Sequence, residues 1–146
     1  QTLVAQAIQV KINIIQEDPF DRGRRAVLNL GHTFAHAIEI VTDHAVRHGE
    51  AVAMGLVAAS NLPAGLGHCS ADLQKRIESA LEATALPTRT PADVNPRRLL
   101  KVMASDKKKK AGRLRFVLLR DIGNVFVTDK VDQKAVIETL KELTAA

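Results

Sequence analysis

Residues 24–41 read RRAVLNLGHTFAHAIEIV, and the apolar positions recur with the period of an α-helix. Four polar side chains follow one another at spacings of four, three and four residues: Arg25, Asn29, His32 and His36. At about 100° per residue, these four share one stripe of a helix. The opposite stripe is apolar and consists of Val27, Leu30, Phe34, Ala37 and Val41. We therefore predict one helix over about 24–41 whose polar face, lacking the usual Lys and Glu, indicates an anion site, a metal site or both.

The composition favours a single helical domain. The chain has 146 residues, of which 46% are hydrophobic but only 3% aromatic, so its core must consist of Leu, Ile, Val and Ala. Further helices are predicted from His48 onward and over 3–16, 71–85, 96–104 and 132–144. Alternating and β-branched residues around Asp121-Ile122-Gly123 predict a β-hairpin near 113–128. The expected fold is mainly α, a multi-helix domain over 1–146 with one small hairpin.

Cysteine usage and charge narrow the class of protein. Cys69 is the only cysteine, so an internal disulfide is excluded, and we expect a reducing, cytoplasmic location. No apolar run has the length of a membrane span, and no signal-peptide pattern opens the sequence, so no membrane partner is expected. The net charge of +5 allows an anionic ligand or nucleic acid. Because Gln1 already stands in a helical pattern, we expect the chain to be part of a longer protein.

The histidines are candidate metal ligands. His32 and His36 lie one helical turn apart, a spacing that lets two imidazoles meet one ion, although most such pairs are surface or capping residues. His48 opens the next helix, which an antiparallel helix pair would fold back near His32. Glu50 is either a partner of a metal-binding imidazole or an ordinary N-terminal helix charge. The remaining His44 and His68 are expected at the surface.

The basic residues allow several interpretations. Arg25 and Asn29 suit a phosphate or carboxylate, but from residue type alone an arginine that caps the helix or forms an ion pair is favoured. Lys11 lies among apolar residues, where extension of its amine to solvent is the ordinary explanation, and Asp21 is a candidate helix N-cap. The first interpretation of the basic run 107–110 is a solvated loop, and the second is a phosphate site. A nucleic-acid site ranks third, because the chain has no Trp or Tyr.

Three stretches together resemble one enzyme family. Residues 25–39 (RAVLNLGHTFAHAIE) and 48–55 (HGEAVAMG) resemble the core signature of 3-dehydroquinate synthases. Asp106-Lys107-Lys108, with RFVLL at 115–119 and Ile122-Gly123, resembles a later motif of the same family. The resemblance runs from Lys11 to the end and corresponds to the family's C-terminal, mostly helical domain.

This resemblance implies a lyase of the shikimate pathway that converts 3-deoxy-arabino-heptulosonate 7-phosphate to 3-dehydroquinate and phosphate. It implies a divalent zinc or cobalt ion, a NAD cofactor bound mainly by an N-terminal domain absent from this sequence, and a homodimer when full length. The chain alone is therefore expected to fold without catalysing the reaction. Alternatives are a related sugar-phosphate cyclase making inosose or valiolone products, and a basic helical module that binds nucleic acid.

The resemblance also assigns roles residue by residue. It makes His32 and His48 the metal ligands, in place of the His32–His36 pair that spacing alone would favour. It gives four residues both a substrate or phosphate contact and a catalytic role: His36, Lys11, Arg25 and Asn29. One of Lys107 and Lys108 is a further substrate or phosphate contact. Asp21 stands on the NAD or substrate side, where the family usually has a glutamate. The family's third metal ligand, also a glutamate, lies upstream of Gln1.

Overall fold

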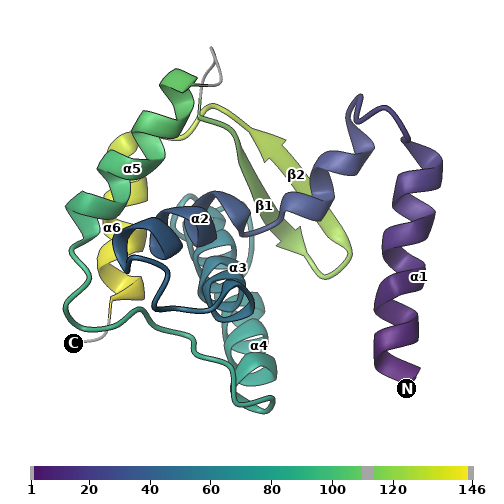
Figure 1. Ribbon diagram of the computed structural model, residues 1–146, viewed down its shortest axis with the longest axis horizontal. Coiled ribbons are helices and arrows are strands. Elements are labelled where there is room, and N and C mark those ends of the chain that lie inside the picture. The colour runs from purple at the N-terminus through teal and green to yellow at the C-terminus, as the bar shows by residue number, and fades with distance from the viewer. Residues whose placement is uncertain (1, 110–113, 145–146) are drawn as a thin grey trace.

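Helices and one hairpin make up the described chain. The computed structural model describes residues 2–109 and 114–144, with the side chains of Ala71 and residues 106–109 left out. The elements are α1 (Thr2–Glu17), the 3-10 helix η1 (Arg24–Asn29), α2 (His32–Val41), α3 (His48–Gly65), α4 (Ala71–Glu82), α5 (Pro96–Lys109), β1 (Phe116–Asp121), β2 (Asn124–Thr128) and α6 (Gln133–Leu143). The mainly α fold with a small hairpin is confirmed (Figure 1).

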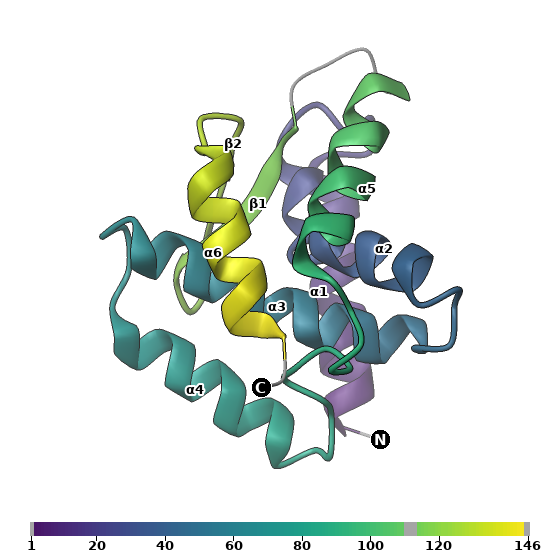
Figure 2. The ribbon, with the colours of Figure 1, turned by 90° about the vertical axis from the view of Figure 1, so that its left-hand side faces the viewer.

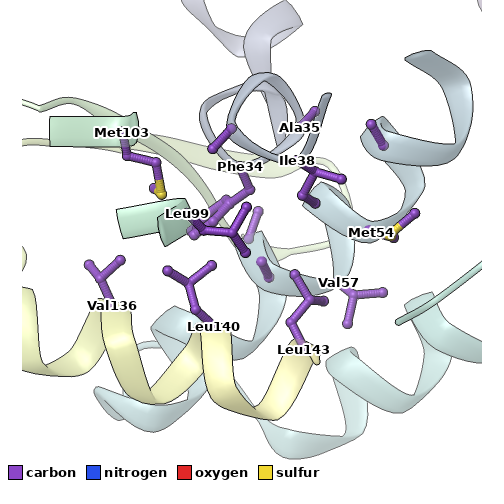
Figure 3. Packing of buried hydrophobic residues seen from close by; sticks show 14 of the residues in the cluster. Phe34, Ala35, Ile38, Met54, Val57, Leu99, Met103, Val136, Leu140 and Leu143 are labelled. Carbon is purple, nitrogen blue, oxygen red and sulfur yellow. The ribbon is translucent and has the colours of Figure 1, made fainter. Parts of the chain in front are cut away.

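The core forms where α2, α3, α5, α6 and the hairpin meet. Phe34 of α2 and Phe116 of β1 are buried, with their ring centroids 5.6 Å apart. Leu99 of α5 and Leu140 of α6 are fully buried in the same cluster, and Figure 3 shows Leu99 beside Phe34. The rest of the core is aliphatic, as the composition predicts. In Figure 2, α4 runs below α3, outside this central group, and packs on α3.

The two strands pair antiparallel, with Phe116 opposite Thr128 and Leu119 opposite Val125. A bulge falls between Leu119 and Asp121, and the turn uses Gly123 at φ 76°, a conformation that glycine adopts without steric cost. The hairpin predicted near 113–128 is therefore confirmed for its described part.

Helix α1 stands apart from the core and contacts the chain through η1 (Figure 1). It has no buried residue, and Leu3, Val4 and Ile8 are 82%, 66% and 53% exposed. None of the helices in the described ranges is both long enough and apolar enough to cross a membrane.

The single helix predicted over 24–41 is wrong, because the chain breaks at Leu30 and Gly31. Arg24–Asn29 form a 3-10 helix, Leu30 is extended at ψ 127°, and Gly31 is left-handed at φ 76°. Helix α2 starts only at His32, and the Gly31 carbonyl accepts hydrogen bonds from the Phe34 and Ala35 amides. A left-handed residue ends the 3.6-residue period, so Arg25 and Asn29 do not share a helix with the histidines.

The basic run is helical where the structure describes its backbone. The predicted solvated loop over 107–110 is wrong for Lys107–Lys109, because α5 continues to Lys109. Lys110 lies outside the described residues.

Candidate metal and anion site

Three imidazoles from α2 and α3 lie together. His32 is the first residue of α2, His36 follows one turn later, and His48 is the first residue of α3. The His32 ring centroid lies 5.8 Å from that of His36 and 5.6 Å from that of His48. The predicted fold-back of α3 onto α2 is therefore confirmed, and His32 is the shared member of both ring contacts.

Hydrogen bonds fix which nitrogens are free on two of these rings. His32 Nδ1 lies 3.1 Å from the Leu30 carbonyl oxygen, and His48 Nδ1 lies 3.1 Å from Glu39 Oε1. Carbonyl and carboxylate oxygens only accept, so in both rings Nδ1 carries the proton and donates. In the neutral ring Nε2 then keeps its lone pair, which is the form in which imidazole binds a metal.

Glu39 is the residue that the sequence analysis missed. Its side chain is 15% exposed, and it accepts from His48, whose side chain is 59% exposed. Glu50, the carboxylate considered for this role, instead accepts from the Arg47 amide at 3.0 Å and closes a capping box. The spacing holds a signal for Glu39, since it follows His32 by two helical turns and thus lies on the same face of α2.

An open cavity of about 780 Å³ adjoins the histidines. Polar residues from several segments contribute to its wall: Asp21, Arg22, Asn29, His32, Thr33, His36 and Arg115. Thr33 Oγ1 donates to the Arg115 carbonyl at 3.2 Å, which ties the start of α2 to the residue before β1. Asn29, His32, His36 and Asp21 were predicted site residues, whereas Arg115 was noted only as the first residue of the RFVLL motif at 115–119. The wall therefore contains residue types that donate to an anion, an amide, imidazoles and arginines, beside the one carboxylate of Asp21.

The other predicted contacts lie elsewhere or outside the described side chains. Arg25 Nη1 donates to the Pro19 carbonyl at 3.4 Å, and neither Arg25 nor Lys11 is among the residues lining the cavity. Lys11 is exposed on α1. Lys107 and Lys108 lie in the last turns of α5, but their side chains are outside the described residues. Their proposed substrate contacts stay predictions.

Asp18 organises the turn before η1, a role the sequence analysis gave to Asp21. Its carboxylate accepts from the backbone amides of Arg22, Gly23 and Arg25 at 2.8, 2.9 and 3.0 Å. These hydrogen bonds, with the Arg22 amide foremost, lower the pKa of Asp18 below its ordinary value. The N-cap prediction for Asp21 is wrong, because Gly23 precedes η1, and Asp21 sits at φ 53° beside the cavity.

Comparison with known proteins assigns the chain to a family. A sequence model described as 3-dehydroquinate synthase C-terminal matches residues 1–109. The chain belongs to this family. It is 43% identical over 145 residues to a 3-dehydroquinate synthase of Xanthomonas campestris and 44% identical over 148 residues to one of Ruegeria. These alignments cover 95% and 97% of the chain but 39% and 40% of the relatives, so the chain spans about two fifths of their length.

Two solved structures share the fold. A 2-epi-5-epi-valiolone synthase from Streptomyces hygroscopicus, with NAD⁺ and Zn²⁺ bound, matches with a TM-score of 0.83 at 23% identity, covering 97% of this chain and 39% of that one. A 2-deoxy-scyllo-inosose synthase complexed with carbaglucose-6-phosphate, NAD⁺ and Co²⁺ matches with a TM-score of 0.83 at 22% identity, over 97% of this chain and 40% of that one. At these identities the likeness shows the fold.

Proposed function

We propose that the chain forms the metal- and phosphate-binding part of a 3-dehydroquinate synthase, which converts 3-deoxy-arabino-heptulosonate 7-phosphate to 3-dehydroquinate with release of phosphate. The family match over residues 1–109 supports the reaction class. The relatives at 43% and 44% identity carry that name, whereas the inosose and valiolone synthases are only 22–23% identical. The related cyclase is therefore the weaker alternative.

The observation that carries the proposal is the pair of oriented imidazoles. The His32 and His48 ring centroids lie 5.6 Å apart with the rings inclined at 61°, and Nδ1 is engaged on both rings, which leaves the Nε2 atom of each ring for a divalent ion. Neutral imidazole is a common ligand of zinc and of cobalt, so these residues fit the ion that the family implies. When bound, such an ion polarises a hydroxyl or carbonyl oxygen of the substrate.

The residues of the cavity have a separate role in this proposal. Asn29 and Arg115 donate hydrogen bonds to an anionic group of the substrate, and His36 contacts the same group from the next turn of α2. Asp21, also in the wall, is the candidate on the NAD or substrate side. Holding the phosphate in a fixed orientation favours its departure. The translational and rotational freedom that the reacting geometry requires the substrate to give up is then already lost on binding. NAD, when bound, supplies the hydride acceptor, and we assign its binding mainly to another part of the protein.

A chimera tests the proposal directly. The part of the Xanthomonas relative that aligns with this chain is replaced by the 146 residues, and phosphate release is measured with the heptulosonate phosphate, NAD⁺ and Zn²⁺. Turnover that is lost in His32→Ala and His48→Ala but kept in His68→Ala supports the proposal, since His68 is exposed and contacts Phe126 instead. A folded chimera that binds Zn²⁺ yet releases no phosphate would contradict it. The homodimer and the cytoplasmic location stay predictions.

A further inference from the structure

Two glycine backbones, Gly31 before α2 and Gly55 within α3, lie in close contact. A Cβ added to Gly55 would overlap the Gly31 carbonyl oxygen and lie 3.0 Å from the Gly31 carbonyl carbon. A Cβ added to Gly31 would lie 2.8 Å from the Gly55 carbonyl carbon and 2.9 Å from the Leu56 nitrogen. Because all these neighbours are backbone atoms, neither contact can be relieved by turning a side chain.

The same two helices meet a second time at the histidines. Gly31 opposes Gly55, and Glu39 opposes His48 through the 3.1 Å hydrogen bond. These contacts are eight residues apart on α2 and seven apart on α3, which is about 12 Å and about 10 Å along the respective axes. The helices therefore run antiparallel in matched register, fixed at one end by the glycines and at the other by the Glu39–His48 pair.

We propose that Gly55 is a positioning residue for the His32–His48 pair, an inference that rests on the proposed metal site. Its lack of a side chain lets α3 approach the backbone of Gly31, and this approach sets the distance between the two imidazoles. Gly55 itself touches no ligand in this account. It acts through the backbone next to His32.

A displacement at Gly31 is transmitted to His32 by two routes. Gly31 directly precedes His32, and its carbonyl begins the hydrogen bonding of α2 through the amides of Phe34 and Ala35. On its other side, Leu30 provides the carbonyl that holds His32 Nδ1. The backbone and the orienting acceptor of His32 therefore both move when Gly31 moves.

The size of the displacement follows from van der Waals distances. Non-bonded carbons rest at about 3.5–4.0 Å, so relieving the 3.0 Å approach to the Gly31 carbonyl carbon requires a shift of at least about 0.5 Å. The overlap with the carbonyl oxygen requires more. Functional constellations tolerate only about 0.5 Å of misplacement, so one methyl group exceeds the tolerance of a two-imidazole site.

The experiment compares Gly55→Ala with two controls. Gly65→Ala makes the same substitution in the last residue of α3, where an added Cβ meets nothing within 4 Å. Leu140→Ala removes a fully buried side chain of α6 and serves as a variant that loses stability without touching the glycine contact. Each 146-residue variant is titrated with Zn²⁺ by calorimetry, and the histidine ring nitrogens are read by ¹⁵N NMR without metal at slightly alkaline pH.

We expect Gly55→Ala to raise the Kd for Zn²⁺ about tenfold or more, as altering the groups that orient a ligand commonly does. Its metal-free spectrum should lose the Nδ1-protonated pattern at His48 or His32. Both controls should keep the wild-type Kd and spectrum. Unchanged Kd and ring-nitrogen spectra in a folded Gly55→Ala protein would overturn the inference, as would an equal loss of affinity in Leu140→Ala.

Two further arms keep the test decisive. If Gly55→Ala does not fold in buffer, the three variants are compared in an osmolyte that favours the compact state, with the same criteria. If the wild-type chain binds no Zn²⁺ that depends on His32 and His48, the proposed metal site fails. The metal-free nitrogen spectra still decide whether Gly55 sets the imidazole geometry, so the two failures are distinguishable.

Discussion

Removal of the Glu39 carboxylate should weaken metal binding without unfolding the chain. Glu39 accepts the Nδ1 proton of His48 at 3.1 Å, which holds the ring in one orientation and, in the neutral ring, leaves the lone pair on Nε2. Glu39→Ala deletes the acceptor, whereas Glu39→Gln keeps the shape and replaces the charged acceptor with a neutral amide oxygen. The two variants therefore separate the charge from the hydrogen bond.

The exposure of the pair sets the magnitude. Hydrogen bonds to charged groups contribute about 1.5–3 kcal/mol, but the His48 side chain is 59% exposed, so solvent screening places this one at or slightly below the lower end. A loss of about 1.4 kcal/mol corresponds to a tenfold weaker Kd for Zn²⁺ in Glu39→Ala. A neutral hydrogen bond is about half as strong, so Glu39→Gln should lose only about threefold.

Calorimetric Zn²⁺ titration of the 146-residue chain measures both losses. Glu138→Ala is the matched control, because Glu138 also pairs with a cation, Lys141 at 2.9 Å, but on α6. The expected order of Kd is wild type and Glu138→Ala, then Glu39→Gln, then Glu39→Ala. Equal affinity of Glu39→Ala and wild type, in a chain where His48→Ala does weaken binding, would refute the role of this carboxylate.

Three other substitutions or treatments test the fold. Because backbone hydrogen bonds lower the pKa of Asp18, its carboxylate stabilises the fold above the ordinary value of 3.8, and this contribution is lost as the pH falls through the lower folded-state pKa. Asp18→Asn should therefore lower the Tm at neutral pH and flatten its acid dependence below about pH 4, and melts with the wild-type acid profile would contradict this. Leu140→Ala should reduce the free energy of unfolding by about 2–5 kcal/mol in a urea titration, and a loss well under 1 kcal/mol would show that its packing is misjudged. Burial, with a smaller effect of Asp121, raises the pKa of the Cys69 thiol, so iodoacetamide should label the folded chain several-fold more slowly than the urea-unfolded chain, and equal rates would count against that environment.

The helices were predictable because each shows an amphipathic period or a run of small residues. The break at Gly31 was not predictable, because a glycine inside a continuous helical period is read as a weak helical residue. Gly31 is left-handed, and its backbone lies against that of Gly55 on α3, 24 positions away. A period in one segment holds no information about such a contact.

The site was predictable in part for the same reason. The approach of His48 to His32 followed from an antiparallel helix pair, and the structure confirms it. The role of Glu39 did not follow, because a glutamate on a partly exposed helical position is ordinarily a solvated charge. Its function depends on which residue α3 places opposite, and this depends on the register that the glycines fix.

Because the proposed metal site has only two protein ligands in the described residues, this register should matter more there than in a closed metal cage. Catalytic zinc usually has three protein ligands, whereas no group of three His, Cys, Asp or Glu side chains in the described residues is placed to hold an ion. The affinity of two imidazoles for an ion depends on how well their nitrogens already converge in the metal-free protein. Reorienting a misdirected ring costs free energy, and this cost reduces the net binding free energy. A third donor from outside the described residues would raise the affinity but would not correct the angle between the rings. The Gly31–Gly55 contact and Glu39 should therefore have a larger effect on metal affinity when fewer other ligands hold the ion.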